Sequence, residues 1–274
     1  GGGEGGNAVG FAGKAASALL WNAGRALPIQ KNKIVVTNFY GRGYGDNLKP
    51  IVEELLKRGG DVLHLGFTSG QSGSIHNAFL AAEMLKEKYP EQKLLVVDTL
   101  CSSSGYGMLV DTVADMRDTG ATVEEAYQWT MDNRNKVHHQ FFSTDMTQFR
   151  RTGRVSGATA AIATVLNICP IMRLDSKGAI KAYDKVRGKH KAIEVTADTM
   201  EQHAQGGRDY DQRCWICHSQ CLDLAKQLAE QLEQRFPHLK DQIRIFDIGT
   251  IIGSHAGPGT VAVFFYGDER PEMA

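Results

Sequence analysis

The sequence has no excess of charge of either sign, because 31 lysines and arginines balance 31 aspartates and glutamates. A chain without a basic or acidic surplus has no electrostatic reason to attract nucleic acid or an anionic membrane surface. It also lacks an apolar run long enough to cross a bilayer. We therefore expect no nucleic acid partner and no stable membrane insertion.

Two signals of export are also missing. The first residues lack the basic-then-apolar order of a secretory signal, and five cysteines are an odd number for a disulfide framework. Reduced thiols are typical of cytosolic proteins, so we expect a cytoplasmic location. With 274 residues, of which 42% are hydrophobic, the chain can bury one large core or two smaller ones.

The first half of the chain has an α/β pattern. Residues 1–32 are glycine- and alanine-rich and form a flexible or atypical segment in our prediction. From Lys33, apolar runs predict strands at 34–36, 61–67 and 94–97, and amphipathic spacing predicts helices at 48–57, 76–88, 108–117 and from Thr122 to about Val137. This alternation favours a parallel sheet covered by helices.

The second half has an α+β pattern. Helices are expected at 143–151, 158–167, 189–202 and 220–235, and strands at 171–174, 180–186, around Trp215, at 243–248 and at 261–266. Residues 175–178 carry a hairpin signal between two of the strands. We therefore predict an α/β domain over 33–142 and an α+β domain with a largely antiparallel sheet over 143–274.

Three loops rich in glycine or hydroxyl groups follow predicted strands. Residues 68–74 and 101–105 each open a helix, and the loop at 248–259 carries His255. In a parallel sheet, loops at the carboxyl ends of strands hold ligands, and a helix N-terminus with small side chains suits a carboxylate or phosphate. Serines are also ordinary helix caps, so the prediction of an anion site depends on all three loops together. Arg154 adds a fork suited to such an anion.

These segments together resemble the DegV family, the fatty-acid-binding proteins that serve bacterial fatty acid kinases. Five motifs occur in the family's order between residues 33 and 267. They are Thr68-Ser-Gly-Gln-Ser-Gly-Ser74, Val97 to Leu109, Phe149-Arg-Arg-Thr-Gly-Arg-Val-Ser156, Ile168 to Ala192 and Ile248 to Gly259.

The resemblance implies a two-domain fold with a fatty acid between the domains. It places the carboxylate at Thr37, Ser69 and Ser72, and it places Arg154 and His255 near the head group or at a kinase contact. Thr68, Ser103, Ser104 and Gly257 are secondary candidates. It also implies an ATP-binding kinase subunit as partner, with no catalytic residue, cofactor or metal in this chain.

The sequence departs from the family pattern in three places. Thr37-Asn-Phe replaces the family's Thr-Ser-Gln, Gln71 replaces an apolar residue, and Thr152 replaces the first glycine of a Gly-Gly-Arg motif. The lipid interpretation is physically reasonable, because each buried CH₂ contributes about 0.8 kcal/mol. The small, apolar segment 158–166 is either a tunnel wall or an ordinary packed helix.

Other functions remain open from the sequence. A serine hydrolase would use Ser69 or Ser72 with His255 and Asp98, although no G-x-S-x-G elbow is present. Cys214-x-x-Cys217-His218 matches haem attachment, and Cys221 extends it toward a zinc pattern. Residues 41–45 are glycine-rich but lack the spacing of a nucleotide loop.

Overall fold

Two β-sheets organise the part of the chain that the structure, a computed structural model, describes: residues 48–155 and 167–272. In chain order the first elements are α2 (Leu48–Lys57), β1 (Val62–Gly66), α3 (Ser74–Lys88), β2 (Leu94–Asp98), α4 (Ser103–Asp118) and α5 (Val123–Asn133). They are followed by β3 (Val137–Ser143), α6 (Thr147–Thr152), β4 (Ile168–Leu174), β5 (Ile180–Arg187), α8 (Lys189–His203), β6 (Trp215–His218), α9 (Leu222–Arg235), β7 (Arg244–Asp247), α10 (Thr250–Ala256) and β8 (Thr260–Tyr266).

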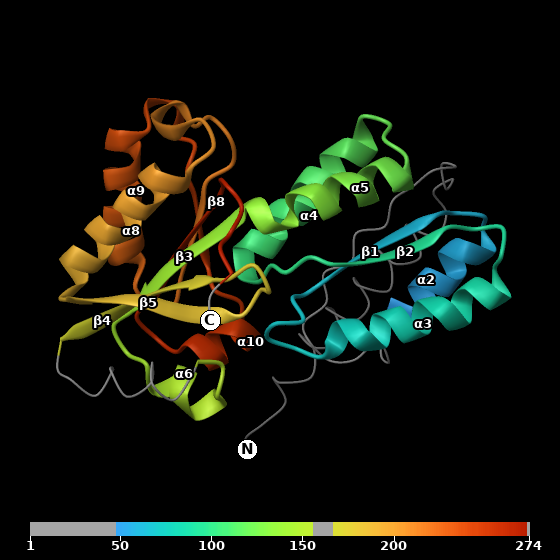
Figure 1. Cartoon of the computed structure of the whole chain (residues 1–274), viewed down its shortest axis with the longest axis horizontal. Helices are drawn as coiled ribbons and strands as arrows, with labels where there is room; N and C mark the ends of the chain where they lie inside the picture. The colour runs from blue at the N-terminus through green and yellow to red at the C-terminus, as the bar shows by residue number, and fades with distance from the viewer. Residues whose placement is uncertain (1–47, 156–166, 273–274) are drawn as a thin grey trace, which may run out of the picture.

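The smaller sheet is parallel and is covered on both faces. Its strands β1 and β2 pair from Val62 opposite Leu94 to Gly66 opposite Asp98. Figure 1 shows α2 and α3 on one side of this pair and α4 and α5 on the other. Successive side chains of a strand point to opposite faces, so Val62 joins the cluster beneath α2 and α3 while Leu63 joins the main core. The predicted parallel α/β arrangement is confirmed for this region.

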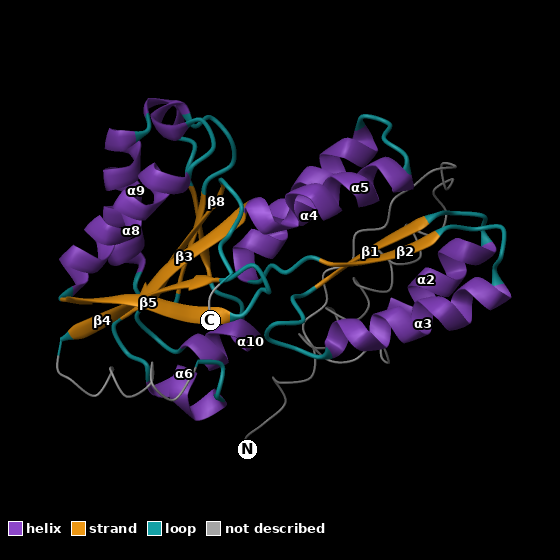
Figure 2. Ribbon diagram, viewed as in Figure 1, coloured by secondary structure: helices purple, strands orange, loops and turns teal. Residues whose placement is uncertain are grey.

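The larger sheet has six strands in the order β5-β4-β3-β8-β6-β7. All neighbouring pairs are antiparallel except β6 and β7. Helices α8 and α9 pack on one face of this sheet (Figure 2), and the N-terminal part of α4 contacts β3, β6 and β8. The largely antiparallel sheet expected for the second half is therefore present.

Several local predictions are confirmed. The β4–β5 hairpin turns at Asp175–Gly178, and Thr122 and Glu125 form a reciprocal capping box at the start of α5. Helix α8 lies within one residue of its predicted range. Three predictions fall outside the described residues. They are the strand at 34–36, the site residue Thr37, and the helix at 158–167 except for Asn167.

The strand β3 was not predicted. We expected a helix to continue to about Val137, but α5 ends at Asn133 and β3 begins at Val137. All seven residues of β3 are buried, including two histidines and a glutamine, so the strand has no polar face that would produce an alternating pattern. The expected boundary between residues 142 and 143 falls inside β3, and we propose that the domain division lies just ahead of this strand.

The loop after β1 packs backbone to backbone against the β4–β5 turn. The Thr68 hydroxyl donates to the Gly178 carbonyl oxygen at 3.2 Å, and the Gln71 amide donates to the same oxygen at 3.1 Å. A Cβ at Gly70 would lie 2.6 Å from the Ala179 nitrogen and closer still to Gly178. This contact joins the small sheet to the large one and leaves no room for a side chain at Gly70.

Substituting Gly70 with alanine should therefore weaken the whole fold. We expect Gly70→Ala to lower the free energy of unfolding by about 1–3 kcal/mol, because the added methyl group meets backbone that cannot move aside. Urea denaturation measures the change. Gly73→Ala in the same loop is the control, because Gly73 has φ −74° and open space around it; equal stability of the two variants would contradict the prediction.

Candidate functional site

A cavity of about 550 Å³ lies between the large sheet, the N-terminus of α4 and helix α10. This volume is in the range of sites for small organic ligands, about 300–1,000 Å³. The apolar part of its wall includes Phe141, Phe149, Leu174, Ile180, Phe246 and Phe264. The wall is more apolar than polar, and its polar side chains include the carboxylate of Asp247 as well as serines, histidines and Arg154. This mixed composition suits an amphiphilic ligand.

Strand β8 shows how the sequence builds this wall. Alternate side chains Val261, Val263 and Phe265 are fully buried beneath the packing helices. The intervening residues Thr260, Ala262 and Phe264 line the cavity. Strands β3 and β6 follow the same rule, because His139 and Phe141 face the cavity, as do Trp215 and Cys217.

The serine loop after β1 contributes one of its two predicted ligand serines. Ser72 is half-buried and lines the cavity, and its hydroxyl lies 3.2 Å from that of Ser74. Ser69 is exposed and is absent from the lining. Its backbone N–H donates to the Asp98 carboxylate at 3.2 Å, so Ser69 fixes the loop. Thr68 is also outside the lining, because it is fully buried at the junction with the β4–β5 turn.

The loop after β2 directs the N-terminus of α4 at the cavity. Ser103 and Ser104 line it, as predicted for secondary candidates, and so does Ser102. Leu100 and Ser103 have φ values of 54° and 50°, a left-handed conformation that costs energy for residues with a side chain. The N-cap residue Ser102 makes no side-chain cap hydrogen bond, and the partial positive charge of the helix N-terminus faces the cavity.

Two buried or half-buried guanidinium groups hold this strained loop. Arg134 donates to the Asp98 carbonyl oxygen at 2.8 Å, and Arg270 donates to the Leu100 carbonyl oxygen at 2.9 Å. Burial lowers the pKa of Arg270. The loop is therefore fixed by side chains from two other parts of the chain.

His139 orients the same helix from the sheet. Its Nε2 accepts from the Ser102 N–H at 3.1 Å, and its Nδ1 donates to the Val137 carbonyl oxygen at 2.9 Å. These two partners fix one neutral tautomer. Complete burial holds the pKa of His139 well below its usual value of 6.5, and the nearby positive charge of Arg270 lowers it further. Protonation would remove the lone pair that anchors α4.

Arg154 and His255 were predicted near the head group or at a kinase contact. Both line the cavity; Arg154 is exposed, and its guanidinium donates to the Thr152 carbonyl oxygen at 2.6 Å. His255 is half-buried, and its Nδ1 atom is buried with no hydrogen-bond partner in the described structure. We expected His255 in a glycine-rich turn, but it belongs to the short helix α10. Gly257 ends that helix and is not part of the lining.

The predicted hydrolase triad is not assembled. Asp98 accepts from the backbone N–H groups of Ser69 and Leu100 and lies outside the cavity lining. Within residues 48–155 and 167–272, no hydrogen bond joins His255 to a serine or to Asp98. The geometry therefore provides no histidine base that is held by a carboxylate and bonded to a serine nucleophile.

The cysteine motif also does not form a metal site in the described part of the chain. Cys217 lines the cavity and contacts the Ser103 hydroxyl at 3.4 Å, and burial raises its pKa to about 11. Cys214 is buried in the core, and His218 lies 3.5 Å from the Asp247 carboxylate. The three side chains do not converge. None of the helices in the described ranges has the length and apolar character needed to cross a bilayer.

The fold and the cavity define an α/β protein with a largely apolar internal site. Comparison with known sequences then identifies it: the chain matches the DegV family model, described as "Uncharacterised protein, DegV family", over residues 45–268. It is 36% identical over 218 residues to the DegV domain-containing protein CPE0026 of Clostridium perfringens, covering 80% of this chain and 74% of that protein. The chain belongs to the DegV family.

Solved structures agree with this assignment. The fatty acid binding DegV family protein SAG1342 of Streptococcus agalactiae is 26% identical with a TM-score of 0.68, covering 82% of this chain and 76% of that one. A DegV family protein from Eubacterium eligens, loaded with heptadecanoic acid, is 21% identical with a TM-score of 0.69, covering 79% and 78%. The Fatty Acid Kinase B3 protein of Streptococcus pneumoniae, loaded with linoleic acid, is 22% identical with a TM-score of 0.69, covering 79% and 76%.

Sequence reasoning missed several lining residues. His139 and Phe141 were missed with strand β3, and Trp215 and Phe246 were assigned to strands but not to the site. The period-2 alternation of neighbouring strands could have identified Trp215 and Cys217 as sharing one face. No sequence signal pointed to His139.

The buried His139 should make stability pH-dependent. In the unfolded chain this histidine binds a proton near pH 6.5, whereas the folded chain binds it only at much lower pH. The neutral ring therefore makes its full contribution to the free energy of unfolding above about pH 6.5, and that contribution is lost as the pH drops below this value. We expect His139→Gln to reduce the slope of unfolding free energy against pH by about 1 kcal/mol per pH unit between pH 6 and 5.

The measurement is urea denaturation at several pH values. Glutamine is chosen because its side-chain oxygen can still accept from the Ser102 N–H. His190→Gln, at an exposed position of α8, is the matched control and should leave the slope unchanged. An unchanged slope in His139→Gln would contradict the prediction.

Proposed function

We propose that this protein binds a fatty acid in the cavity and presents its carboxylate to an ATP-binding fatty acid kinase. The observation that carries the proposal is the cavity itself: a largely apolar space of about 550 Å³ with serine, arginine and histidine side chains on its wall. Solved structures of relatives with the same fold contain heptadecanoic acid, vaccenic acid or linoleic acid. An acyl chain in such a space gains about 0.8 kcal/mol per buried CH₂.

The polar groups support a head-group position near the N-terminus of α4. Ser72, Ser103 and Ser104 offer hydroxyl groups there, and the helix supplies a partial positive charge of about half a unit. Thr37 and Ser69 came into the proposal through the family resemblance. Thr37 stays a prediction, and the exposed position of Ser69 favours a role for it in shaping the loop, with Ser72 as the direct ligand.

Arg154 and His255 suit the transfer step. Acyl-phosphate formation brings phosphate charge next to the carboxylate, and a guanidinium fork stabilises such charge. His255 lines the cavity, so its imidazole lies next to a ligand bound there. The exposed position of Arg154 at the cavity suits contact with a second protein.

Bound lipid tests the first part of the proposal. We expect organic extraction of purified protein to release about one fatty acid per chain. Ala262→Phe should weaken fatty acid binding at least tenfold, about 1.4 kcal/mol, because the ring projects from β8 into the cavity. Mass spectrometry of extracts and titration with a fluorescent fatty acid measure the effect.

A surface substitution provides the control for that experiment. Leu80→Phe, at an exposed position of α3, adds the same ring away from the cavity lining and should leave binding unchanged. Circular dichroism confirms that both variants fold. The absence of extractable fatty acid together with full binding by Ala262→Phe would contradict the proposal.

The kinase role is tested separately. With ATP and a fatty acid kinase, we expect acyl phosphate to form, and Arg154→Ala or His255→Ala to slow its formation at least tenfold (about 1.4 kcal/mol in the barrier) while the bound fatty acid remains. Arg151→Ala, an exposed arginine of α6 that is absent from the lining, is the matched control. Unchanged turnover in both site variants would remove these residues from the proposed step.

A further inference from the structure

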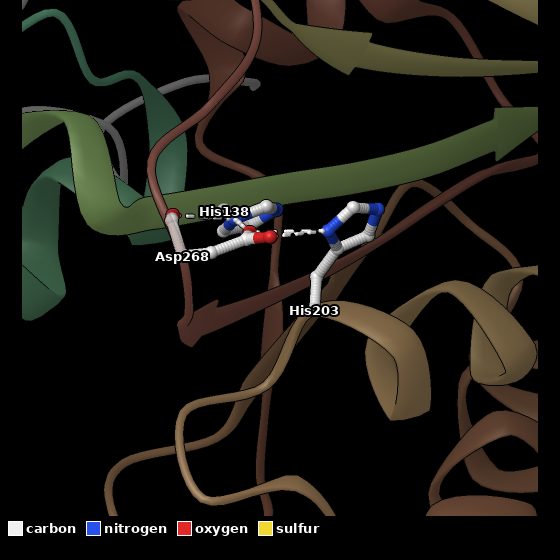
Figure 3. Close-up of side chains that lie close together, drawn as sticks. All are labelled: His138, His203 and Asp268. Atoms are coloured by element: carbon white, nitrogen blue, oxygen red, sulfur yellow. Dashed lines mark hydrogen bonds and ion pairs between the residues drawn. The ribbon is translucent and has the colours of Figure 1, made fainter.

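Two histidines and an aspartate from distant parts of the chain meet outside the cavity. His138 lies near the start of β3, His203 is the last residue of α8, and Asp268 follows β8 (Figure 3). The Asp268 carboxylate is 3.0 Å from His138 Nε2 and 3.0 Å from His203 Nδ1. Within the described ranges, no other group of three histidine, cysteine, aspartate or glutamate side chains gathers this closely.

The backbone fixes the three positions before any ligand is considered. The Asp268 N–H donates to the His203 carbonyl oxygen at 3.1 Å, and the Gly267 N–H donates to the Lys136 carbonyl oxygen at 2.8 Å. A Cβ at Gly267 would lie 2.8 Å from the His138 ring and closer still to the His203 carbonyl oxygen. Only glycine therefore allows the segment that carries Asp268 to pass this close to both histidines.

Each imidazole ring turns one nitrogen, His138 Nε2 or His203 Nδ1, toward the Asp268 carboxylate. The two rings stack with centroids 5.2 Å apart and an interplanar angle of 24°, and His138 stacks on Phe265 as well. A neutral imidazole is the form that binds a metal ion. His138 Nε2 lies 2.9 Å from the Asp268 carbonyl oxygen as well as 3.0 Å from its carboxylate, so without an ion this nitrogen carries the ring proton. When Nε2 binds a metal ion, the proton moves to Nδ1, which has no partner in the described structure.

We propose that His138, His203 and Asp268 form a site for a divalent transition metal ion of the zinc class. Two imidazole nitrogens and one carboxylate are ligands that Zn²⁺ accepts at about 2.0–2.2 Å, with a fourth position left for water. Asp268 is exposed, so both the ion and that water have access. Mg²⁺ and Ca²⁺ prefer oxygen ligands and do not suit two imidazoles.

The ligand atoms need only a small adjustment. They lie within 4.8 Å of one another, and tetrahedral ligands at zinc distances are about 3.4 Å apart. The exposed Asp268 and half-buried His203 side chains can provide this contraction, whereas His138 is held by the stack. The bound ion would fasten the end of α8 and the segment after β8 to the central strand β3. None of the three residues lines the cavity, so this proposal stands apart from fatty acid binding.

Calorimetric titration of the metal-free full-length protein with Zn²⁺ tests the proposal. We expect one ion per chain and a higher Tm in the presence of Zn²⁺. His203→Ala and Asp268→Asn should each weaken binding at least tenfold. His190→Ala, an exposed histidine on the same helix, should leave binding unchanged. Mg²⁺ should produce no binding signal.

Co²⁺ distinguishes this site from the cysteines. The absorption spectrum of the Co²⁺ complex should lack a thiolate charge-transfer band, because no cysteine belongs to the site. His203 is half-buried and Asp268 exposed, and circular dichroism verifies that both variants fold. Absence of one-to-one binding, a thiolate band, or undiminished binding in both variants would overturn the proposal and leave a hydrogen-bonded His–Asp–His cluster.

Discussion

The close packing of the loop after β1 against the β4–β5 turn is the constraint on which the site depends. Gly70 and Gly178 bring two backbones into contact, and the Thr68 and Gln71 side chains bond to the same Gly178 carbonyl oxygen. This contact places the loop that carries Ser72 at the edge of the large sheet. A side chain at either glycine would separate the serine groups from the wall that faces them.

The position of α4 depends on a second set of contacts that oppose local backbone preference. Leu100 and Ser103 are left-handed, and their conformation persists because Arg134, Arg270 and His139 each hold a backbone group of this loop. This strained segment directs the helix N-terminus at the cavity. Because these donors are already in place, binding an anion requires no free energy to order them.

The sequence predicted those elements of the fold whose patterns are local. The β4–β5 hairpin, α8 and the capping box at Thr122 are examples. Strand β3 was missed because its buried residues include two histidines and a glutamine, so it lacks the continuous apolar run that predicted the equally buried strand β8. Of the predicted site residues, Ser72, Arg154 and His255 line the cavity and Ser69 does not, and their ligand roles stay predictions. Spacing cannot distinguish a loop serine that faces a ligand from one whose backbone anchors the loop.

Strand β8 has a consequence for how this protein can diversify. Its even-numbered side chains from Thr260 to Phe264 shape the cavity, and its odd-numbered side chains belong to the core beneath α8 and α9. Substitutions at even-numbered positions can alter the shape of the cavity while leaving the core packing in place. Selection can therefore change ligand preference and stability separately along one strand, so close relatives can share an architecture while differing in the ligands they accept.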